Sequence, residues 1–162
     1  MSLFKAIISF FMITVCFSSM AATPSNLPHG CEIIGFGYND NYLILNQTGN
    51  QSFYLIQNRS SGPIELQRIE TKEVFMSPPL TAKLEPSNWG AFASDVENLH
   101  FQCYIKESDA NKIIDCREVL EVCQYPRVKF ALSNMGNYWV STNKTQSQVI
   151  NESAGKGILL RW

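Results

Sequence analysis

Four cysteines are the residues best suited to chemistry, and they are Cys31, Cys103, Cys116 and Cys123. A free thiol beside a histidine can act as a nucleophile, and thiolates can hold zinc. Zinc sites usually contain two cysteines separated by two to four residues, whereas six residues separate Cys116 from Cys123. An even number of cysteines in an exported chain indicates two disulfides instead. We therefore expect all four to be bridged, with no metal and no cysteine nucleophile.

The histidines and carboxylates give little indication of catalysis. His100 falls on the outward side of an alternating run and His29 precedes the first expected strand, so we expect both to be solvated. Carboxylates close enough in sequence for a glycosidase pair are Glu70 with Glu73 and Asp95 with Glu97. Nothing indicates the apolar pocket that would raise the pKa of one member and leave the other low. We expect solvated loop charges, no catalytic residues and no cofactor.

Aromatic residues near turns are the remaining candidates for a binding site. Trp89, Tyr138 and Trp139 could form a contact patch for a protein or a sugar, because aromatic side chains dominate such contacts. The alternative places Trp89 and Trp139 in the core, which is the more frequent role for tryptophan. Trp89, Tyr138 and Trp139 are the candidate contact surface.

The stretch Leu99–Cys123 holds three of the five cysteines and should be the stapled centre of the fold. Leu99–Ile105 alternates between apolar and polar residues, which is typical of a half-buried strand. A second apolar run starts at Ile113. A four-residue hairpin loop over Ser108–Asn111 would therefore set Cys103 opposite Cys116.

Three disulfide pairings are open, and the sequence does not choose among them. The hairpin favours Cys103–Cys116, which leaves Cys31–Cys123. The immunoglobulin-like alternative is Cys31–Cys103, whose spacing suits a bridge between sheets. An immunoglobulin domain has a tryptophan about a dozen residues after its first cysteine, and Tyr42 stands near that position.

Short strands separated by turn residues predict the fold class. Such runs recur along the chain, and turn signals such as Asn58–Pro63 separate them. A short helix is expected over Thr145–Ala154, with Thr142 or Asn143 as its N-cap and Gly155 at its end. The prediction is a mainly β, antiparallel, immunoglobulin-like sandwich with a short C-terminal helix, stapled by disulfides.

The first 22 residues have the pattern of a secretory signal peptide. Lys5 precedes an apolar run over residues 6–17, and small residues at Ser19 and Ala21 follow. A membrane span needs about 20 apolar residues, and this run is shorter. The alternative interpretation is an uncleaved membrane anchor. Bulky residues before Cys16 argue against lipidation. We expect a flexible leader over 23–30, a single domain over 31–162, no membrane span after cleavage, and a periplasmic or secreted location.

Charge and modification signals narrow the choice of partners. The net formal charge is −1 and no basic stripe occurs, so nucleic acid is not an expected partner. Five sequons would accept glycans in a eukaryotic secretory pathway, at Asn46, Asn50, Asn58, Asn143 and Asn151. The asparagine and isoleucine richness and the brief signal favour a bacterium, in which these are polar loop residues.

Several segments resemble the enhanced-entry protein B family of Legionella and related gammaproteobacteria. They are residues 53–60, 84–92, 101–103, 115–123 and 138–140, followed by Asn143-Lys144-Thr145. These motifs are structural and cover most of the mature chain. The resemblance implies an exported, non-enzymatic factor associated with bacterial entry into host cells, a virulence role, acting with neighbouring entry proteins.

Residues and resemblance together predict an exported binding module that acts by protein–protein contact, with another entry or envelope protein as its partner. One alternative is an inhibitor or chaperone of a cell-envelope enzyme, which would present a protruding loop or an exposed sheet edge. The other is an envelope hydrolase, which would require a cleft that holds a carboxyl group of raised pKa. The identity of the partner and the oligomeric state are outside what the sequence specifies.

Overall fold

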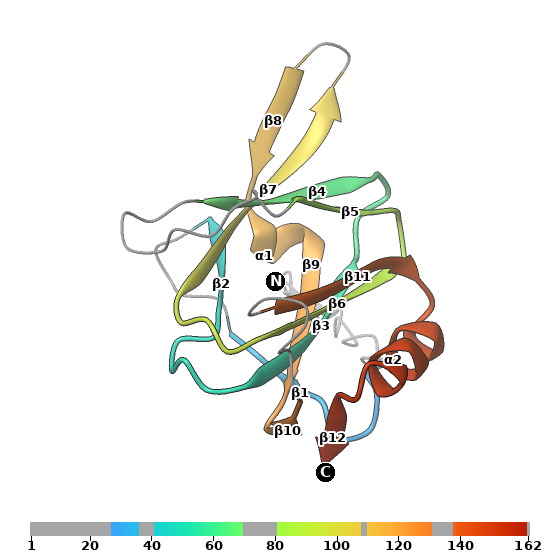
Figure 1. Ribbon diagram of the computed structural model, residues 1–162. Coiled ribbons are helices and arrows are strands. Elements are labelled where there is room, and N and C mark those ends of the chain that lie inside the picture. The colour runs from blue at the N-terminus through green and yellow to red at the C-terminus, as the bar shows by residue number, and fades with distance from the viewer. Residues whose placement is uncertain (1–26, 36–40, 70–80, 108–109, 131–137, 162) are drawn as a thin grey trace, which may run out of the picture.

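Two antiparallel sheets packed face to face make up the body of the protein (Figure 1). The computed structural model describes residues 27–35, 41–69, 81–107, 110–130 and 138–161. The predicted signal peptide and residues 23–26 of the predicted leader lie outside this part of the chain. The mainly β, antiparallel sandwich that the sequence predicts is confirmed.

Sheet A has five strands. In spatial order they are β1 (Glu32–Ile33), β9 (Leu120–Tyr125), β3 (Ser52–Asn58), β6 (Trp89–Ser94) and β11 (Tyr138–Lys144). Each neighbouring pair is antiparallel. Both central strands, β3 and β6, are buried along almost their whole length.

Sheet B has four strands that lie side by side and a fifth that pairs with only one of them. The order is β2 (Tyr42–Leu45), β7 (Leu99–Glu107), β4 (Ile64–Ile69) and β5 (Thr81–Leu84), and β8 (Ala110–Ile114) pairs with the end of β7. Inward residues of sheet B are apolar and alternate with outward polar or half-exposed residues. This period of two is why the sequence revealed these strands.

The space between the sheets is the first core. Its aromatic centre is Phe92 of sheet A against Phe101 of sheet B, with ring centroids 5.5 Å apart in an edge-on arrangement. Aliphatic side chains from both sheets surround this pair, among them Leu43, Ile56 and Leu66. Burying this face of each sheet is the main reason that the two sheets stack.

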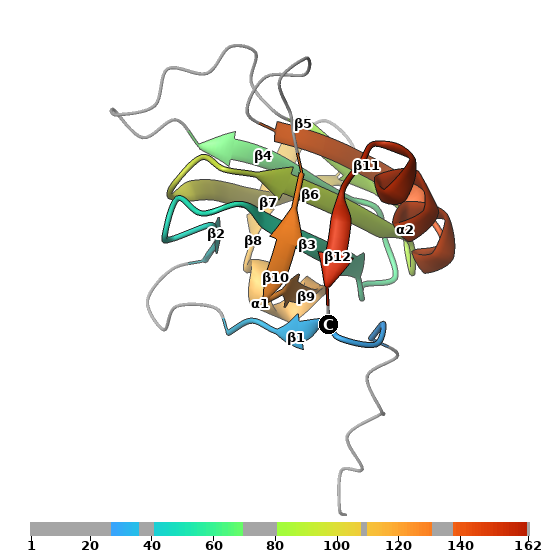
Figure 2. The same ribbon diagram turned by 60° about the horizontal axis from the view of Figure 1, so that its bottom comes forward.

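A second core lies on the other face of sheet A. Helix α2 (Gln146–Gly155) and the paired strands β10 (Arg127–Lys129) and β12 (Leu159–Arg161) cover this face (Figure 2). Val149 of α2 and Ile158 before β12 are fully buried there. Sheet A is therefore apolar on both faces, which explains why β3 and β6 read as continuous rather than alternating apolar runs.

The two disulfides are Cys31–Cys123 and Cys103–Cys116. The favoured pairing is thus confirmed, and the Cys31–Cys103 bridge of the immunoglobulin-like alternative does not form. The protein shares the two-sheet sandwich with immunoglobulin domains but not their strand order. Its sheet A has the order β1-β9-β3-β6-β11, which differs from the order of either immunoglobulin sheet.

Three local expectations need correction. The β7–β8 ladder closes with Glu107 opposite Ala110, so the loop is shorter than the four residues expected. Helix α2 exists, but its N-cap is Thr145, which forms a capping box with Gln148, and the helix continues through Gly155. Leu27 packs against the second core, so the end of the predicted flexible leader belongs to the folded domain.

Candidate functional site

The β7–β8 hairpin extends beyond the rest of the sandwich (Figure 1). The register explains why. The ladder between β7 and β4 ends at Tyr104, whereas the ladder between β7 and β8 continues to Glu107. The last residues of β7 are therefore paired with β8 alone among the described strands.

A disulfide locks the base of this hairpin. Cys103 and Cys116 are fully buried and lie 13 residues apart in sequence. Cys116 begins α1 (Cys116–Val119), whose N-cap Asp115 accepts a hydrogen bond from the backbone N–H of Arg117 at 2.9 Å. Side-chain hydrogen bonds from Arg117 also lower the pKa of the Asp115 carboxyl. The backbone N–H of Cys116 donates to the carbonyl of Asn41 at 3.4 Å, which ties the hairpin to the start of β2.

The outer face of the hairpin carries a small amphipathic surface, which we call the hairpin patch: Tyr104, Lys106, Asn111 and Ile113. Tyr104 is directly opposite Ile113, and Lys106 is directly opposite Asn111, so the four side chains share one face. Ile113 is 51 % exposed, which is unusual for a large aliphatic residue. The hydroxyl of Tyr104 donates to Gln102 at 2.6 Å, which fixes the ring beside Ile113.

A cleft lies on the other side of the hairpin base. Ile105 and Ile114 from the hairpin, Val119 from α1 and Pro63 from the β3–β4 turn form its apolar walls, with Glu118 on its rim. Both faces of the hairpin therefore offer apolar surface, within a scaffold that the staple holds in place.

The predicted contact surface is not formed by its two tryptophans. Trp89 is 6 % exposed and Trp139 is 4 % exposed, and both belong to the second core. Trp139 stacks on Phe53, with ring centroids 6.3 Å apart and planes 14° apart. Both tryptophans are therefore core residues, as the alternative interpretation had it, because α2, β10 and β12 cover this face of sheet A. Tyr138 begins β11 opposite Ser94.

The residues with catalytic potential that the structure describes lie at its surface. His100 is half-buried on the outer face of sheet B, and Asp95 and Glu97 are exposed after β6. Glu70 and Glu73 lie outside the described residues. No group of three or more histidine, cysteine or acidic side chains that could hold a metal occurs in the described part of the chain.

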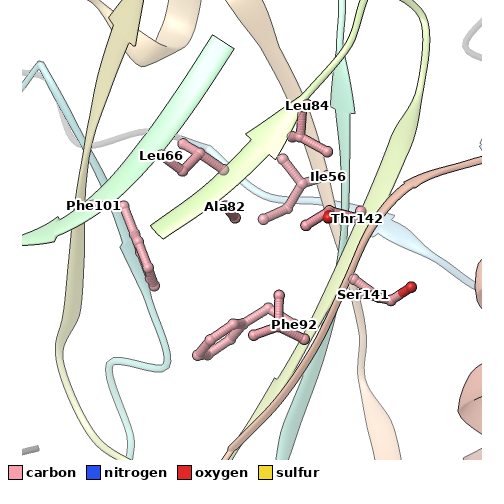
Figure 3. Close-up of a pocket in the computed structure, with 11 residues that line it drawn as sticks. Ile56, Leu66, Ala82, Leu84, Phe92, Phe101, Ser141 and Thr142 are labelled. Atoms are coloured by element: carbon pink, nitrogen blue, oxygen red, sulfur yellow. The ribbon is translucent and has the colours of Figure 1, made fainter. Parts of the chain in front are cut away.

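An apolar cavity lies between the sheets near β5 and β11 (Figure 3). Phe92, Phe101, Leu66 and Ile56 line it, and the hydroxyl of Ser141 turns away from it (Figure 3) to donate to Glu152. Its volume of about 20 Å³ is close to what a single water needs. We interpret it as a small packing gap.

Sequence reasoning missed the hairpin patch. Ile113 appeared only as part of an apolar run, and Tyr104 only as an outward residue of β7. The available signal was the register: once the hairpin is closed, the outward Tyr104 stands opposite Ile113. Finding it required the correct loop length, because the four-residue loop would set Ile113 opposite Lys106, whereas the observed ladder sets it opposite Tyr104 on the same face.

No family model, curated protein or solved structure matches the chain. Within the described ranges, no helix is both long enough and apolar enough to cross a membrane.

Proposed function

We propose that this protein is an exported, non-enzymatic binding module that contacts a protein partner through the hairpin patch. The supporting observation is the exposed Ile113 beside Tyr104 on a hairpin that extends from the body and is stapled at its base. A preorganised hairpin loses little conformational entropy on binding. Tyrosine is also one of the residue types that are enriched at interface hot spots.

The proposal also includes export of the protein from the cytoplasm and a biological role. Two disulfides are what an oxidising compartment produces, and the first 22 residues have the pattern of a signal peptide. We place the protein in the periplasm or outside the cell. The resemblance to the enhanced-entry protein B family supports a role in host-cell entry alongside other entry or envelope proteins.

A second candidate function is inhibition or chaperoning of a cell-envelope enzyme. A protruding element is the feature that this alternative requires, and the β7–β8 hairpin is one. Because the hairpin is narrow and convex, it suits a partner with a cleft. The two candidates differ in whether binding lowers the turnover of the partner.

The test is affinity capture from an envelope fraction with three proteins: the parent, Ile113→Glu and Leu159→Glu. Leu159 is 56 % exposed and lies on β12, away from the hairpin, so it is a matched control. We expect one partner to be retained by the parent and by Leu159→Glu and to be lost with Ile113→Glu. Equal recovery with all three proteins would contradict the proposal. If the captured partner is an enzyme, measuring its turnover with and without this protein separates the two candidates.

A further inference from the structure

A second pocket, separate from the hairpin, lies at the open side of the sandwich. We call it the edge pocket, and its walls come from the end of β1, from β2 and the loop after it, from β3 and from β9: Ile34, Gly35, Ile44, Asn46, Gln47, Thr48, Tyr54 and Gln124. At this side β1 and β2 are the outer strands of the two sheets. Its volume is about 190 Å³.

Gln124 is a polar residue at a position that the fold makes inward-facing. It is directly opposite Tyr54 in the β3–β9 ladder, so both side chains are on the same face of sheet A. Phe92 of β6 is directly opposite Tyr54 on its other side, so it lies on the same face of sheet A, in the first core. The amide nitrogen of Gln124 donates to Ser52 at 3.4 Å, a long contact. Its carbonyl oxygen accepts no hydrogen bond within the described residues, which leaves an acceptor available at the pocket.

The wall opposite Gln124 is rigid. Asn46 is buried in a left-handed conformation, with φ of 53°. Its side-chain nitrogen donates to the carbonyls of Ser94 (3.3 Å) and Val96 (2.9 Å), and its side-chain oxygen accepts from Ser52 at 3.1 Å. Its backbone N–H donates to the hydroxyl of Tyr54 at 2.8 Å. This network fixes the loop that carries Gln47 and Thr48 before any ligand arrives.

The described part of the lining is uncharged. Among the residues that the structure describes, it contains no acidic, basic or histidine side chain, and burial raises the pKa of the Tyr54 phenol, so this group stays protonated at neutral pH. The hydrogen-bonding groups at hand are the amides of Gln47 and Gln124 and the hydroxyl of Thr48. Ile34 supplies an aliphatic contact, whereas Ile44 is opposite His100 and borders the pocket from the outer face of sheet B. Such a lining suits a neutral ligand that combines an amide, hydroxyls and a methyl group.

We infer that the edge pocket binds a neutral acetamido sugar unit, with the ligand amide paired to Gln124, hydroxyls to Thr48 and the acetyl methyl against Ile34. The class is set by chemistry. A charged sugar would lose hydration without gaining a counter-charge from the described lining. An acetamido group offers both an N–H to the Gln124 carbonyl and a methyl group to Ile34, whereas a sugar hydroxyl offers the hydrogen bond without the methyl contact. This site is independent of the hairpin patch and would add carbohydrate recognition to a protein-binding module.

Ligand-observed NMR of the intact two-disulfide protein tests this assignment, with N-acetylglucosamine as the probe and glucose and glucosamine as comparisons. We expect saturation transfer to the acetyl methyl of N-acetylglucosamine and a dissociation constant that can be titrated. Glucose and glucosamine should bind at least about threefold more weakly, the size of one buried methyl contact. Absence of saturation transfer, or equal binding of all three sugars, would overturn the assignment.

Matched variants place the ligand in the pocket. Gln124→Leu should weaken binding of N-acetylglucosamine at least about fivefold. Gln57→Leu, on β3 outside the edge pocket, should leave it unchanged. Thr48→Val is the second pocket variant and lies in an exposed loop, so it keeps the test valid if Gln124→Leu fails to fold. Unchanged affinity in the folded pocket variants would refute the site.

Discussion

Asn58 offers a demanding test of the packing at the end of β3. Its side chain is fully buried and makes four hydrogen bonds. The amide nitrogen donates to the carbonyls of Gly62 (2.8 Å) and Leu84 (2.9 Å), and the amide oxygen accepts from the backbone N–H and the hydroxyl of Ser60 at 2.9 and 2.7 Å. Asn58→Asp preserves the shape and both accepted bonds while it replaces the donor nitrogen with oxygen. The variant thus isolates the two donated bonds.

The magnitude follows from those two bonds and from charge. A neutral aspartic acid can donate to only one of the two carbonyls, so one buried hydrogen bond is lost, at a cost of about 1 kcal/mol if Gly62 keeps its bond from the Ser60 hydroxyl and up to about 3 kcal/mol if Leu84 loses its bond. Ionisation would face the carboxylate with two carbonyl oxygens, so we expect the pKa of Asp at position 58 in the folded state to rise above the unfolded value of about 3.9. Above a pH of about 3.9, the unfolded state of the variant therefore binds fewer protons than the folded state. Stability of the variant therefore falls as pH rises, by about 1.4 kcal/mol for each unit of pKa rise.

Urea unfolding followed by circular dichroism measures this at pH 4.5 and at pH 7.5. We expect Asn58→Asp to be less stable than the parent at both values and the deficit to be larger at pH 7.5. Asn50→Asp is the control, because Asn50 is exposed and should change stability by less than about 0.5 kcal/mol. A deficit for Asn58→Asp that stays below 0.5 kcal/mol, or that shrinks as pH rises, would refute the reasoning.

Three further predictions concern the staple, a close backbone approach and an ion pair. Replacing Cys103 and Cys116 together by alanine should lower the free energy of unfolding in urea by at least about 3 kcal/mol, the loop-entropy value for a bridge across 13 residues; a loss under 1 kcal/mol would contradict it. Gly90→Ala should lower the melting temperature, because a Cβ would lie 3.0 Å from a β11 backbone oxygen; an unchanged melting temperature would count against this close approach. Hydrogen bonds, first from Lys144, lower the pKa of the Glu152 carboxyl, so the stability from this group is present above the unfolded pKa and is lost as pH falls through the folded pKa. Comparing acid denaturation of Glu152→Gln with the parent checks this, since the variant should lack that component of the pH dependence and an identical profile would disprove it.

Local pattern was enough to predict the strands but not the register of the central hairpin. The strict alternation in β7 depends only on residues adjacent in sequence, so its strand character was readable. The favoured Cys103–Cys116 pairing is correct, although the expected loop set these cysteines directly opposite each other and the structure pairs Cys103 with Ile114.

What the sequence did not reveal depends on contacts between distant segments. The burial of Trp89 and Trp139 results from α2, β10 and β12 covering sheet A, which no window of sequence encodes. Asn46 and Asn58 look like polar loop residues in glycosylation sequons, yet both are buried and hydrogen-bonded, so neither can carry a glycan in the folded protein. Their partners lie as far as 50 residues away in the chain. Similarly, the inward position of Gln124 is evident only once β9 pairs with β3.

The measurement that tests the central claim most directly is photocrosslinking of the exported protein with a benzophenone amino acid at position 113, compared with the same group at position 159. Both positions are more than half exposed, so chance collisions should label them alike. The account predicts one discrete crosslinked partner at position 113 and none at position 159. The same adducts at both positions, or none at position 113, would contradict it.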